Sequence, residues 1–361
     1  MNEDVYRKLA RVLDTLPNGF PSTENGAEMK LLKKIFDPDE ADLFCDLKLT
    51  FETAQEISER TGRPLETLEE KLIRMRERGQ VMSVALGGTR LFKMVPWAFG
   101  LYELQLNRLD REFAELNEEF APVYGKQFFG NPPQMMQTLP IEEELSMLQE
   151  ALPYQKITKL LESNESFMVM ECICKKEQGI LGKPCTRPLE VCMAMAPIPK
   201  MFDNHPTGRA VSREEARALL KKTEELGLVH LTSNFKNGHF FICNCCGCCC
   251  GVLSSINKLG IPAWTVVNSD YYAAIDSDLC TACGTCADER CQINAIEEGD
   301  EAYSVIPEKC IGCGLCITTC PVEAIRLVRK DEKDIQTPPD DEISWYRERA
   351  WMRGVDIAPY A

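Results

Sequence analysis

The sequence predicts an α+β multidomain fold with a mostly helical N-terminal domain, a central cysteine-rich α/β domain and a small C-terminal domain organised by cysteines. Apolar residues at helical spacing dominate the first 36 residues. Short apolar runs alternate with amphipathic segments in the central region, and eight cysteines form two groups between Cys280 and Cys320. A chain of 361 residues is long enough for two or three domains with separate cores.

Composition narrows the class of protein. Nineteen cysteines in so long a chain, which opens with the acidic sequence MNEDVYRKLA, favour metal-bound thiolates in a reducing cytoplasm over a disulfide-rich secreted protein. No run approaches the roughly 18 apolar residues of a membrane span. The net charge of −15 opposes binding to nucleic acid or to anionic membranes. We therefore expect a cytoplasmic protein without a transmembrane segment.

The first domain is expected to span residues 1–96. Helices are predicted at 5–16 and 24–36. Residues 51–94 then read as two helices, at 53–60 and 64–78, followed by strands at 80–85 and 89–94 around Gly87-Gly88. This order resembles the winged helix-turn-helix family over about 50 residues, and the resemblance implies either DNA binding or a docking module.

Charge separates these two interpretations of the first domain. Residues 41–96 contain nine Lys and Arg and nine Asp and Glu. The start of the second helix, which reads bases in DNA-binding relatives, carries Glu66, Glu69 and Glu70. These carboxylates would face phosphates, although Arg74, Arg76 and Arg78 follow. We expect a docking role and not nucleic-acid binding.

A connecting segment is predicted at 97–150. It comprises a helix over 97–120 and an extended linker over 121–140, where prolines and glycines interrupt the periodicity. At the other end of the chain, residues 331–361 read as an acidic linker and an aromatic-rich helix at 343–353 that docks onto the chain or a partner.

The central domain is expected at 151–270. A helix at 154–162 and a strand at 167–171 lead to the first cysteines, and Pro188 suggests a helix that carries Cys192. A helix at 211–226, capped by Ser212 and Glu215, precedes two strands at 228–235 and 239–242 that pair across Asn237-Gly238.

Ten cysteines make this domain a candidate metal-binding region. Six of them lie in the run CNCCGCCCG, ahead of a helix predicted at 251–259 whose N-terminus would stabilise thiolates. Three alternatives remain open: a third [4Fe–4S] cluster, a larger or second additional cluster, or zinc or a thiol pool for disulfide exchange. The candidate ligands are Cys172, Cys174, Cys185, Cys192, Cys243, Cys245, Cys246, Cys248, Cys249 and Cys250.

Four cysteines of the C-terminal region follow the spacing C-x2-C-x2-C-x3-C-P, ending at Cys320-Pro321. With flanking segments, residues 271–330 resemble a bacterial dicluster ferredoxin. The resemblance implies two [4Fe–4S] clusters with crossed ligation. The first cluster would be held by Cys280, Cys283, Cys286 and Cys320. The second would be held by Cys310, Cys313, Cys316 and Cys291.

The first group departs from the ferredoxin pattern at its fourth cysteine. Four residues, 287–290, separate Cys286 from Cys291 where the family has three, and Gln292 stands where proline is usual. Either the extra residue is absorbed as a bulge and Cys291 remains a ligand, or the second cluster is more exposed or more weakly held.

The remaining candidates are few. Cys45 is expected to be a small core residue. The scattered histidines, His205, His230 and His239, nominate no site, although either of the last two could approach the central cysteines. No catalytic constellation, dinucleotide fingerprint or P-loop is evident.

We therefore predict a non-catalytic electron-transfer subunit of an oxidoreductase. It would pass single electrons through the two clusters and one additional iron–sulfur cluster, to or from a redox enzyme or another electron carrier of an anaerobe. The alternatives are an iron–sulfur transcription regulator that senses redox state and a catalytic iron–sulfur or thiol disulfide reductase.

Overall fold

The computed structural model describes residues 4–141 and 155–361 and divides the chain into two compact units. The first unit comprises residues 1–128, 177–183 and 346–361, and the second comprises residues 129–176 and 184–345. The central cysteine-rich region and the C-terminal cysteine region thus lie in the same unit. Residues 142–154, which include the end of the predicted connecting segment, lie outside the described residues.

The first unit begins with three helices, α1 (Val5–Thr15), α2 (Ala27–Ile35) and α3 (Pro38–Phe44). The Asp4 side chain accepts a hydrogen bond from the backbone N–H of Tyr6 and caps α1. Leu9 and Leu13, four residues apart on one face of α1, are completely buried. The predicted helices at 5–16 and 24–36 are confirmed as α1 and α2.

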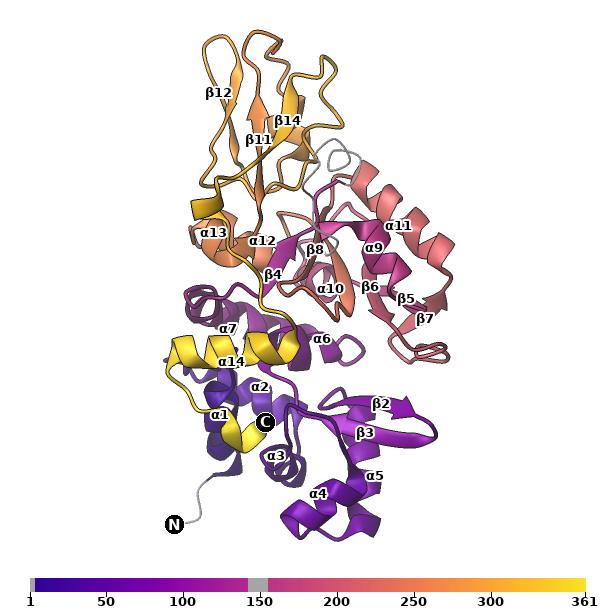
Figure 1. The fold of residues 1–361 in the computed structure, drawn as a ribbon. Coiled ribbons are helices and arrows are strands. Elements are labelled where there is room, and N and C mark those ends of the chain that lie inside the picture. Colours follow the sequence, from indigo (N-terminus) through magenta and orange to yellow (C-terminus); the bar gives the residue numbers. More distant parts are fainter. Residues whose placement is uncertain (1–3, 142–154) are drawn as a thin grey trace. The chain divides into compact units, whose positions relative to one another are not determined.

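A small sheet follows in the same unit (Figure 1). Strand β1 (Glu52–Thr53) precedes helices α4 (Ala54–Thr61) and α5 (Leu65–Glu77), and strands β2 (Met82–Leu86) and β3 (Thr89–Lys93) form a hairpin. All pairings are antiparallel, in the order β1–β3–β2. Thr53 and Glu56 form a capping box at α4, and Gly62 ends that helix in a left-handed conformation. These boundaries agree with the predicted elements within one or two residues.

The single helix predicted at 97–120 is wrong. The chain instead forms the irregular turn η1 (Trp97–Leu101), the short helix α6 (Tyr102–Leu104) and the long helix α7 (Arg111–Phe129). Phe99, with φ of 53°, and Gly100 break the first stretch. Asp110 restarts the helix by accepting a hydrogen bond from the N–H of Phe113 at 2.8 Å.

The extended linker predicted at 121–140 is also wrong, because α7 continues through Pro122. Phe120, Tyr124 and Phe128 are buried at a spacing of four residues, with successive ring centroids 5.5 and 5.3 Å apart. This aromatic stripe stabilises the helix despite the proline. Strand β4 (Met136–Thr138) then enters the main sheet of the second unit, fully buried.

The second unit is built on a seven-stranded sheet in the order β10–β4–β8–β9–β6–β5–β7. Its strands are β5 (Ser166–Glu171), β6 (Glu190–Ala196), β7 (Gly208–Val211), β8 (Val229–Ser233), β9 (Phe241–Cys245), β10 (Val267–Asn268) and β4. The helices between them are α9 (Ile157–Glu162), α10 (Ile173–Ile180), α11 (Arg213–Glu225), α12 (Gly251–Asn257) and α13 (Ala263–Val266). The predicted capping box is present between Ser212 and Glu215 of α11.

The two faces of the sheet have different partners. Leucines of α9 and α11 pack against Phe167, Met193 and Ile242 in one hydrophobic core. Side chains of a strand alternate between faces, so Cys192 and Cys243, the neighbours of Met193 and Ile242, lie on the opposite face. One face of this sheet therefore forms the hydrophobic core, and the other carries thiols.

The helix predicted to carry Cys192 is wrong, because that residue lies in β6. Val191, Met193 and Met195 are buried while Cys192 and Ala194 are less so, which is the two-residue period of a strand. The predicted pairing of the next two strands is confirmed as β8 with β9. Strand β9 extends to Cys245, so it includes the first two cysteines of the CNCCGCCCG run.

Two further antiparallel pairs complete the second unit: β11 (Tyr271–Ile275) with β14 (Ile325–Arg329), and β12 (Ile296–Glu298) with β13 (Tyr303–Val305). Figure 1 shows β11 beside β14, with β12 and the loops that connect these strands. The π-helical turn η3 (Cys286–Arg290) precedes β12, and the short turn η4 (Glu332–Asp334) follows β14.

The terminal helix α14 (Glu342–Arg353) and the turn η5 (Ala358–Tyr360) end the chain. Trp345 is buried and donates its indole N–H to the carbonyl of Gln134 at 2.9 Å, while Trp351 is 77% exposed. Arg349 is buried over the ring of Phe128 and donates to the carbonyl of Pro17. The helix therefore docks on the chain. Among the described residues, no helix is long and apolar enough to cross a membrane.

Candidate metal centres

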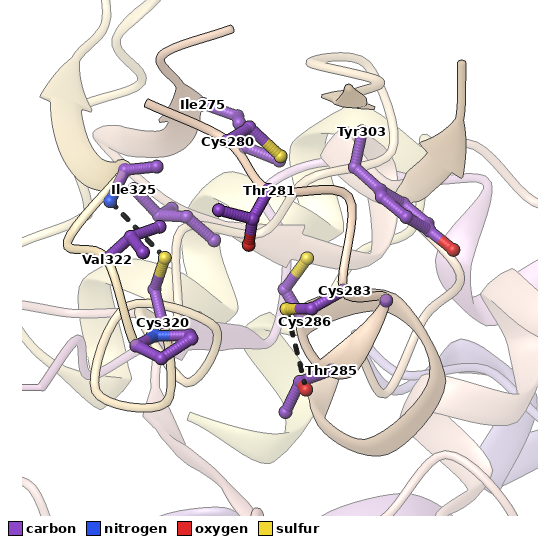
Figure 2. Close-up of a pocket in the computed structure, with 13 residues that line it drawn as sticks. Ile275, Cys280, Thr281, Cys283, Thr285, Cys286, Tyr303, Cys320, Val322 and Ile325 are labelled. Atoms are coloured by element: carbon purple, nitrogen blue, oxygen red, sulfur yellow. Dashed lines mark hydrogen bonds between the residues drawn. The ribbon is translucent and has the colours of Figure 1, made fainter. Parts of the chain in front are cut away.

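All nineteen cysteines lie in the described residues, and none forms a disulfide. Four of them line one pocket in the C-terminal region: Cys280, Cys283, Cys286 and Cys320 (Figure 2). Three come from one loop, and the fourth comes from a segment some 35 residues further along the chain. Ile275, Tyr303 and Ile325 form apolar walls of this pocket. The structure thus brings together the four residues predicted for the first cluster.

A second pocket collects Cys291, Cys310, Cys313 and Cys316, with Ala273, Ile293 and Leu315 around them. Cys291 reaches it because the additional residue between Cys286 and Cys291 is accommodated in the π-helical turn η3. The N–H of Cys291 donates to the carbonyl of Cys286, five residues earlier, at 3.0 Å. Of the two alternatives considered for the additional residue, the structure therefore contains the local bulge. The bulge keeps Cys291 beside the three other cysteines of the second pocket.

Backbone N–H groups point at several of these sulfur atoms. Ala295 donates to the Sγ atom of Cys291 at 3.1 Å, and Ala324 donates to the Sγ atom of Cys320 at 3.3 Å. The residues before these donors, Asn294 and Glu323, both have φ of 53°, so the two loops repeat one conformation. Such hydrogen bonds stabilise thiolate charge and tune cluster potentials.

Gly312 shows why one loop requires glycine. Its φ is +61°, and a Cβ atom there would lie 2.3 Å from the carbonyl oxygen of Tyr271. The cysteine loop can therefore approach β11 only without a side chain at this position. The N–H of Ala273 on the same strand donates to Cys310 at 3.4 Å.

The donor set of both pockets fits a [4Fe–4S] cluster. Each pocket offers four thiols, the number of ligands that such a cluster takes, and each is lined mainly by apolar side chains. The thiols surround a pocket and do not contact one another directly, which leaves the interior for iron and sulfide. Burial raises the pKa of Cys313 to about 12, so its ionisation requires a nearby cation such as a metal.

Comparison with known families agrees with this geometry. Residues 273–327 match the family described as 4Fe-4S dicluster domain. These residues are a dicluster ferredoxin domain.

The relatives of this ferredoxin domain are also ferredoxins. The chain is similar to an uncharacterized ferredoxin of Methanocaldococcus jannaschii, with 32% identity over 28% of this chain and 59% of the relative. It is 43% identical to a ferredoxin of Alicyclobacillus acidocaldarius over 13% of this chain and 63% of that protein. Ferredoxin-1 of Caulobacter vibrioides is 37% identical over 17% of the chain and 54% of the relative. The chain thus spans little more than half the length of these relatives, and no solved structure matches it significantly.

Outside the ferredoxin domain, the ten central cysteines divide into two groups. The first, the four-thiol group, consists of Cys185, Cys246, Cys248 and Cys249, whose sulfur atoms all lie within 4.8 Å of one another. The Sγ atom of Cys248 lies 3.4 Å from that of Cys246 and 3.7 Å from that of Cys185. These separations match four thiolates around one tetrahedral metal ion, which at about 2.3 Å from each sulfur sets them roughly 3.8 Å apart.

The ionisation of the four-thiol group is uneven. Hydrogen bonds from Cys249 and Cys248 lower the pKa of Cys246 to about 5 despite its burial. Burial and the neighbouring Cys246 raise the pKa of Cys248 to about 11, although Cys248 is the exposed member. One thiolate is therefore formed readily, and the others ionise when a cation binds.

The second group, the six-thiol group, consists of Cys172, Cys174, Cys192, Cys243, Cys245 and Cys250. Side-chain hydrogen bonds among its members shift the pKa of each thiol. The closest pair, Cys250 and Cys245, has its sulfur atoms 3.2 Å apart. Hydrogen bonds from Cys192 and Cys245 lower the pKa of Cys243 to about 6. The residue run CNCCGCCCG thus contributes to both groups.

Lys175 is a buried cation beside these thiols that sequence analysis missed. It is 3% exposed, and its Nζ atom donates to the carbonyl of Asn244 at 3.2 Å. Burial alone would lower the pKa of Lys175. The negative charges of nearby thiolates, of which Cys172 contributes most, outweigh this effect and raise the pKa. The sequence could have indicated this role, because Lys175 follows Cys172 and Cys174 in the run ECICKKE.

The four-thiol group contacts the ferredoxin domain through Gly247. Its N–H donates to the Oε1 atom of Gln292 at 2.9 Å, and Asn257 donates to the carbonyl of Gln292 at 2.9 Å. A Cβ atom on Gly247 would lie 2.0 Å from that carbonyl oxygen. Gln292, which replaces the usual proline after Cys291, therefore supplies a contact that proline could not make.

The remaining sequence candidates belong to neither thiol group. His230 hydrogen-bonds to Asn244 at 2.6 Å, and His239 lies 3.3 Å from the hydroxyl of Thr232. Burial lowers the pKa of both to about 4, so both are neutral near pH 7. Cys45 is buried, its thiol contacts the carbonyl of Ala41, and burial raises its pKa to about 12, as suits a core residue.

Proposed function

We propose that this chain is an iron–sulfur electron-transfer protein in which the ferredoxin domain exchanges electrons with a metal centre of the central domain. The eight cysteines of the ferredoxin domain ligate two [4Fe–4S] clusters, four from each pocket. A cluster bound in each pocket supplies transfer of one electron at a time. The four-thiol group holds the additional centre.

The observation that carries this proposal is the contact between Gly247 and Gln292. Gly247 lies between two cysteines of the four-thiol group, and Gln292 directly follows Cys291 of the second ferredoxin pocket. Only Gln292 therefore separates Cys291 of the second ferredoxin pocket from the loop of the four-thiol group. So short a bonded and hydrogen-bonded route suits electron exchange between the two sites.

The first ferredoxin pocket faces the solvent and is the better exit to a partner. Cys283 is exposed, while Cys316 of the second pocket is buried. Leu279 and Val322, which flank cysteines of the first pocket, are 54% and 38% exposed. An apolar rim around an accessible cluster site suits transient docking of a redox enzyme or another electron carrier.

The first unit serves assembly, as a winged-helix-like docking module, and not DNA recognition. Several of its basic side chains are paired within the unit, among them Arg63 with Asp42 and Asp46, and Arg78 with Asp37. Guanidinium groups engaged in this way are not available to phosphates. Salt-sensitive binding of this protein to DNA would contradict this assignment and favour the regulator.

Iron and sulfide analysis with EPR spectroscopy on anaerobically purified protein tests the proposal. We expect more than about eight irons, the content of two [4Fe–4S] clusters, and signals of interacting reduced clusters. One-electron reduction steps in a potentiometric titration must number at least three. Eight irons and two steps would leave the central domain without a redox centre and would overturn the proposal.

A further inference from the structure

The six-thiol group is a candidate metal site of its own. We infer that Cys172, Cys174, Cys192, Cys243, Cys245 and Cys250 bind a polynuclear iron centre separate from the four-thiol group. That the metal is iron rests on the proposed electron-transfer function, whereas the existence of the site rests on the arrangement of the thiols.

The six thiols form a closed ring of neighbours. Cys172 interacts with Cys174 and Cys192, and Cys174 interacts with Cys250. Cys250 contacts Cys245. Cys243 then links Cys245 back to Cys192. Each thiol therefore has two thiol neighbours, and Cys185, Cys246, Cys248 and Cys249 are not part of the ring.

The fold builds this ring from three segments. Cys243 and Cys245 lie two residues apart in β9 and so point to the same face of the sheet. Strand β6 runs antiparallel to β9 with Met193 opposite Ile242, which sets Cys192 beside Cys243. Cys172 and Cys174 come from the junction of β5 and α10, and Cys250 comes from the loop before α12.

Burial argues against six ordinary free thiols. Cys172, Cys245 and Cys250 are less than a tenth exposed, and the other three are only partly accessible. Thiols packed against one another are weak donors and acceptors, and they occupy space that apolar side chains would fill to greater advantage. A metal centre explains why six of them converge.

The number of thiols argues for more than one metal ion. A tetrahedral ion, like a cubane cluster, takes four thiolates. Because the ring is continuous, no subset of four is set apart from the other two. Six thiolates therefore fit a centre of at least two metal ions.

Charge supports an anionic centre. Lys175 is buried and directly follows Cys174 of the ring, and its ammonium group donates to the carbonyl of Asn244, which lies between Cys243 and Cys245. A buried ammonium group is costly without an opposite charge. An iron–thiolate centre with net negative charge provides one.

The location of the ring suits iron. Val229 pairs with Cys245 across β8 and β9, and the same valine lines the second ferredoxin pocket. One side chain therefore separates the six-thiol group from a cluster site. A redox-active metal at this place extends the electron path, which zinc cannot do because it has a single oxidation state in proteins.

Metal analysis of full-length variants, purified anaerobically, tests the inference. In Cys174→Ser/Cys243→Ser, two opposite members of the ring are replaced. We expect it to lose at least two irons relative to wild type while the EPR signals of the ferredoxin clusters remain. Those signals show that the second unit is folded. The matched control, Cys45→Ser, removes a buried thiol of the first unit and must keep all iron.

The complementary variant, Cys185→Ser/Cys248→Ser, changes the two most accessible members of the four-thiol group. It should retain more than the roughly eight irons of the ferredoxin domain. Only eight irons in this variant would overturn the inference, and so would a wild-type iron content in Cys174→Ser/Cys243→Ser. Two or more zinc ions bound at the six-thiol group in place of iron would also overturn it. Unchanged iron content in Cys185→Ser/Cys248→Ser would count against the proposed function, in which the four-thiol group holds a redox metal, but would leave the six-thiol centre standing.

Discussion

The backbone N–H of Gly247 donates to the side-chain oxygen of Gln292 at 2.9 Å. The contact joins the loop of the four-thiol group to the residue after Cys291, within one compact unit. It requires a residue without a side chain at position 247 and a residue other than proline at position 292. The contact therefore couples two candidate redox sites.

Gly247→Ala tests this coupling. Its Cβ atom would lie 2.0 Å from the carbonyl oxygen of Gln292 and must push the two loops apart. We expect a loss of stability of about 1–3 kcal/mol and slower electron exchange between the central centre and the ferredoxin clusters in freeze-quench EPR. The matched control is Gly251→Ala, where an added Cβ atom meets no atom within 4 Å. Equal exchange rates in both variants would refute the role of the contact.

Crossed ligation in the ferredoxin domain predicts in which double variants the iron losses of the single variants add up. Cys291 and Cys310 line the second pocket, and Cys320 lines the first. Cys291→Ala and Cys310→Ala should each remove the second cluster, so the double variant loses no more iron than either single one. Cys291→Ala combined with Cys320→Ala should lose the iron of both clusters. Additive iron loss for Cys291→Ala and Cys310→Ala would show that they serve different sites.

Lys175→Met should lower the reduction potential of the metal centre in the central domain. Reduction adds negative charge next to this buried ammonium group, so its removal disfavours the reduced state. We expect a decrease of about 50–100 mV, equivalent to about 1–2 kcal/mol for one electron. Lys176→Met is the matched control, since Lys176 pairs with Glu171 near the surface. The same shift in both variants, measured by potentiometric EPR, would exclude a specific role for Lys175.

Cysteine spacing predicted the ferredoxin domain because ligand geometry dictates it. Spacing could not divide the ten central cysteines, since the division depends on the register of β6 against β9 and on the alternation of side chains in β9. Pro188 favoured a helix around Cys192, but the buried positions 191, 193 and 195 follow strand periodicity. Likewise, the prolines and glycines over 121–140 indicated a linker, whereas the packing of the Phe120, Tyr124 and Phe128 rings extends a helix through Pro122. Tertiary packing decided both cases.

Glu177 makes the stability of the first unit dependent on pH. Its buried carboxyl accepts hydrogen bonds from the hydroxyl of Tyr102 and the side-chain amide of Asn117, each at 2.9 Å. Burial, which outweighs these hydrogen bonds, raises its pKa from 4.5 to about 7. The folded chain therefore binds this proton more tightly than the unfolded chain does. The associated stabilisation is fully present below about pH 4.5 and is lost as the pH rises to about 7, by about 3 kcal/mol.

Glu177→Gln removes this dependence, because the amide keeps the shape of the protonated acid and its carbonyl oxygen accepts both hydrogen bonds at any pH. In urea unfolding, the variant should exceed wild type by up to about 3 kcal/mol at pH 8 and match it near pH 4.5. Glu115→Gln, at an exposed residue paired with Arg111, is the control and should change stability by less than about 0.5 kcal/mol at either pH. An equal effect of Glu177→Gln at both pH values would mean that its carboxyl does not titrate between them, and the stability of the first unit would then depend on other groups.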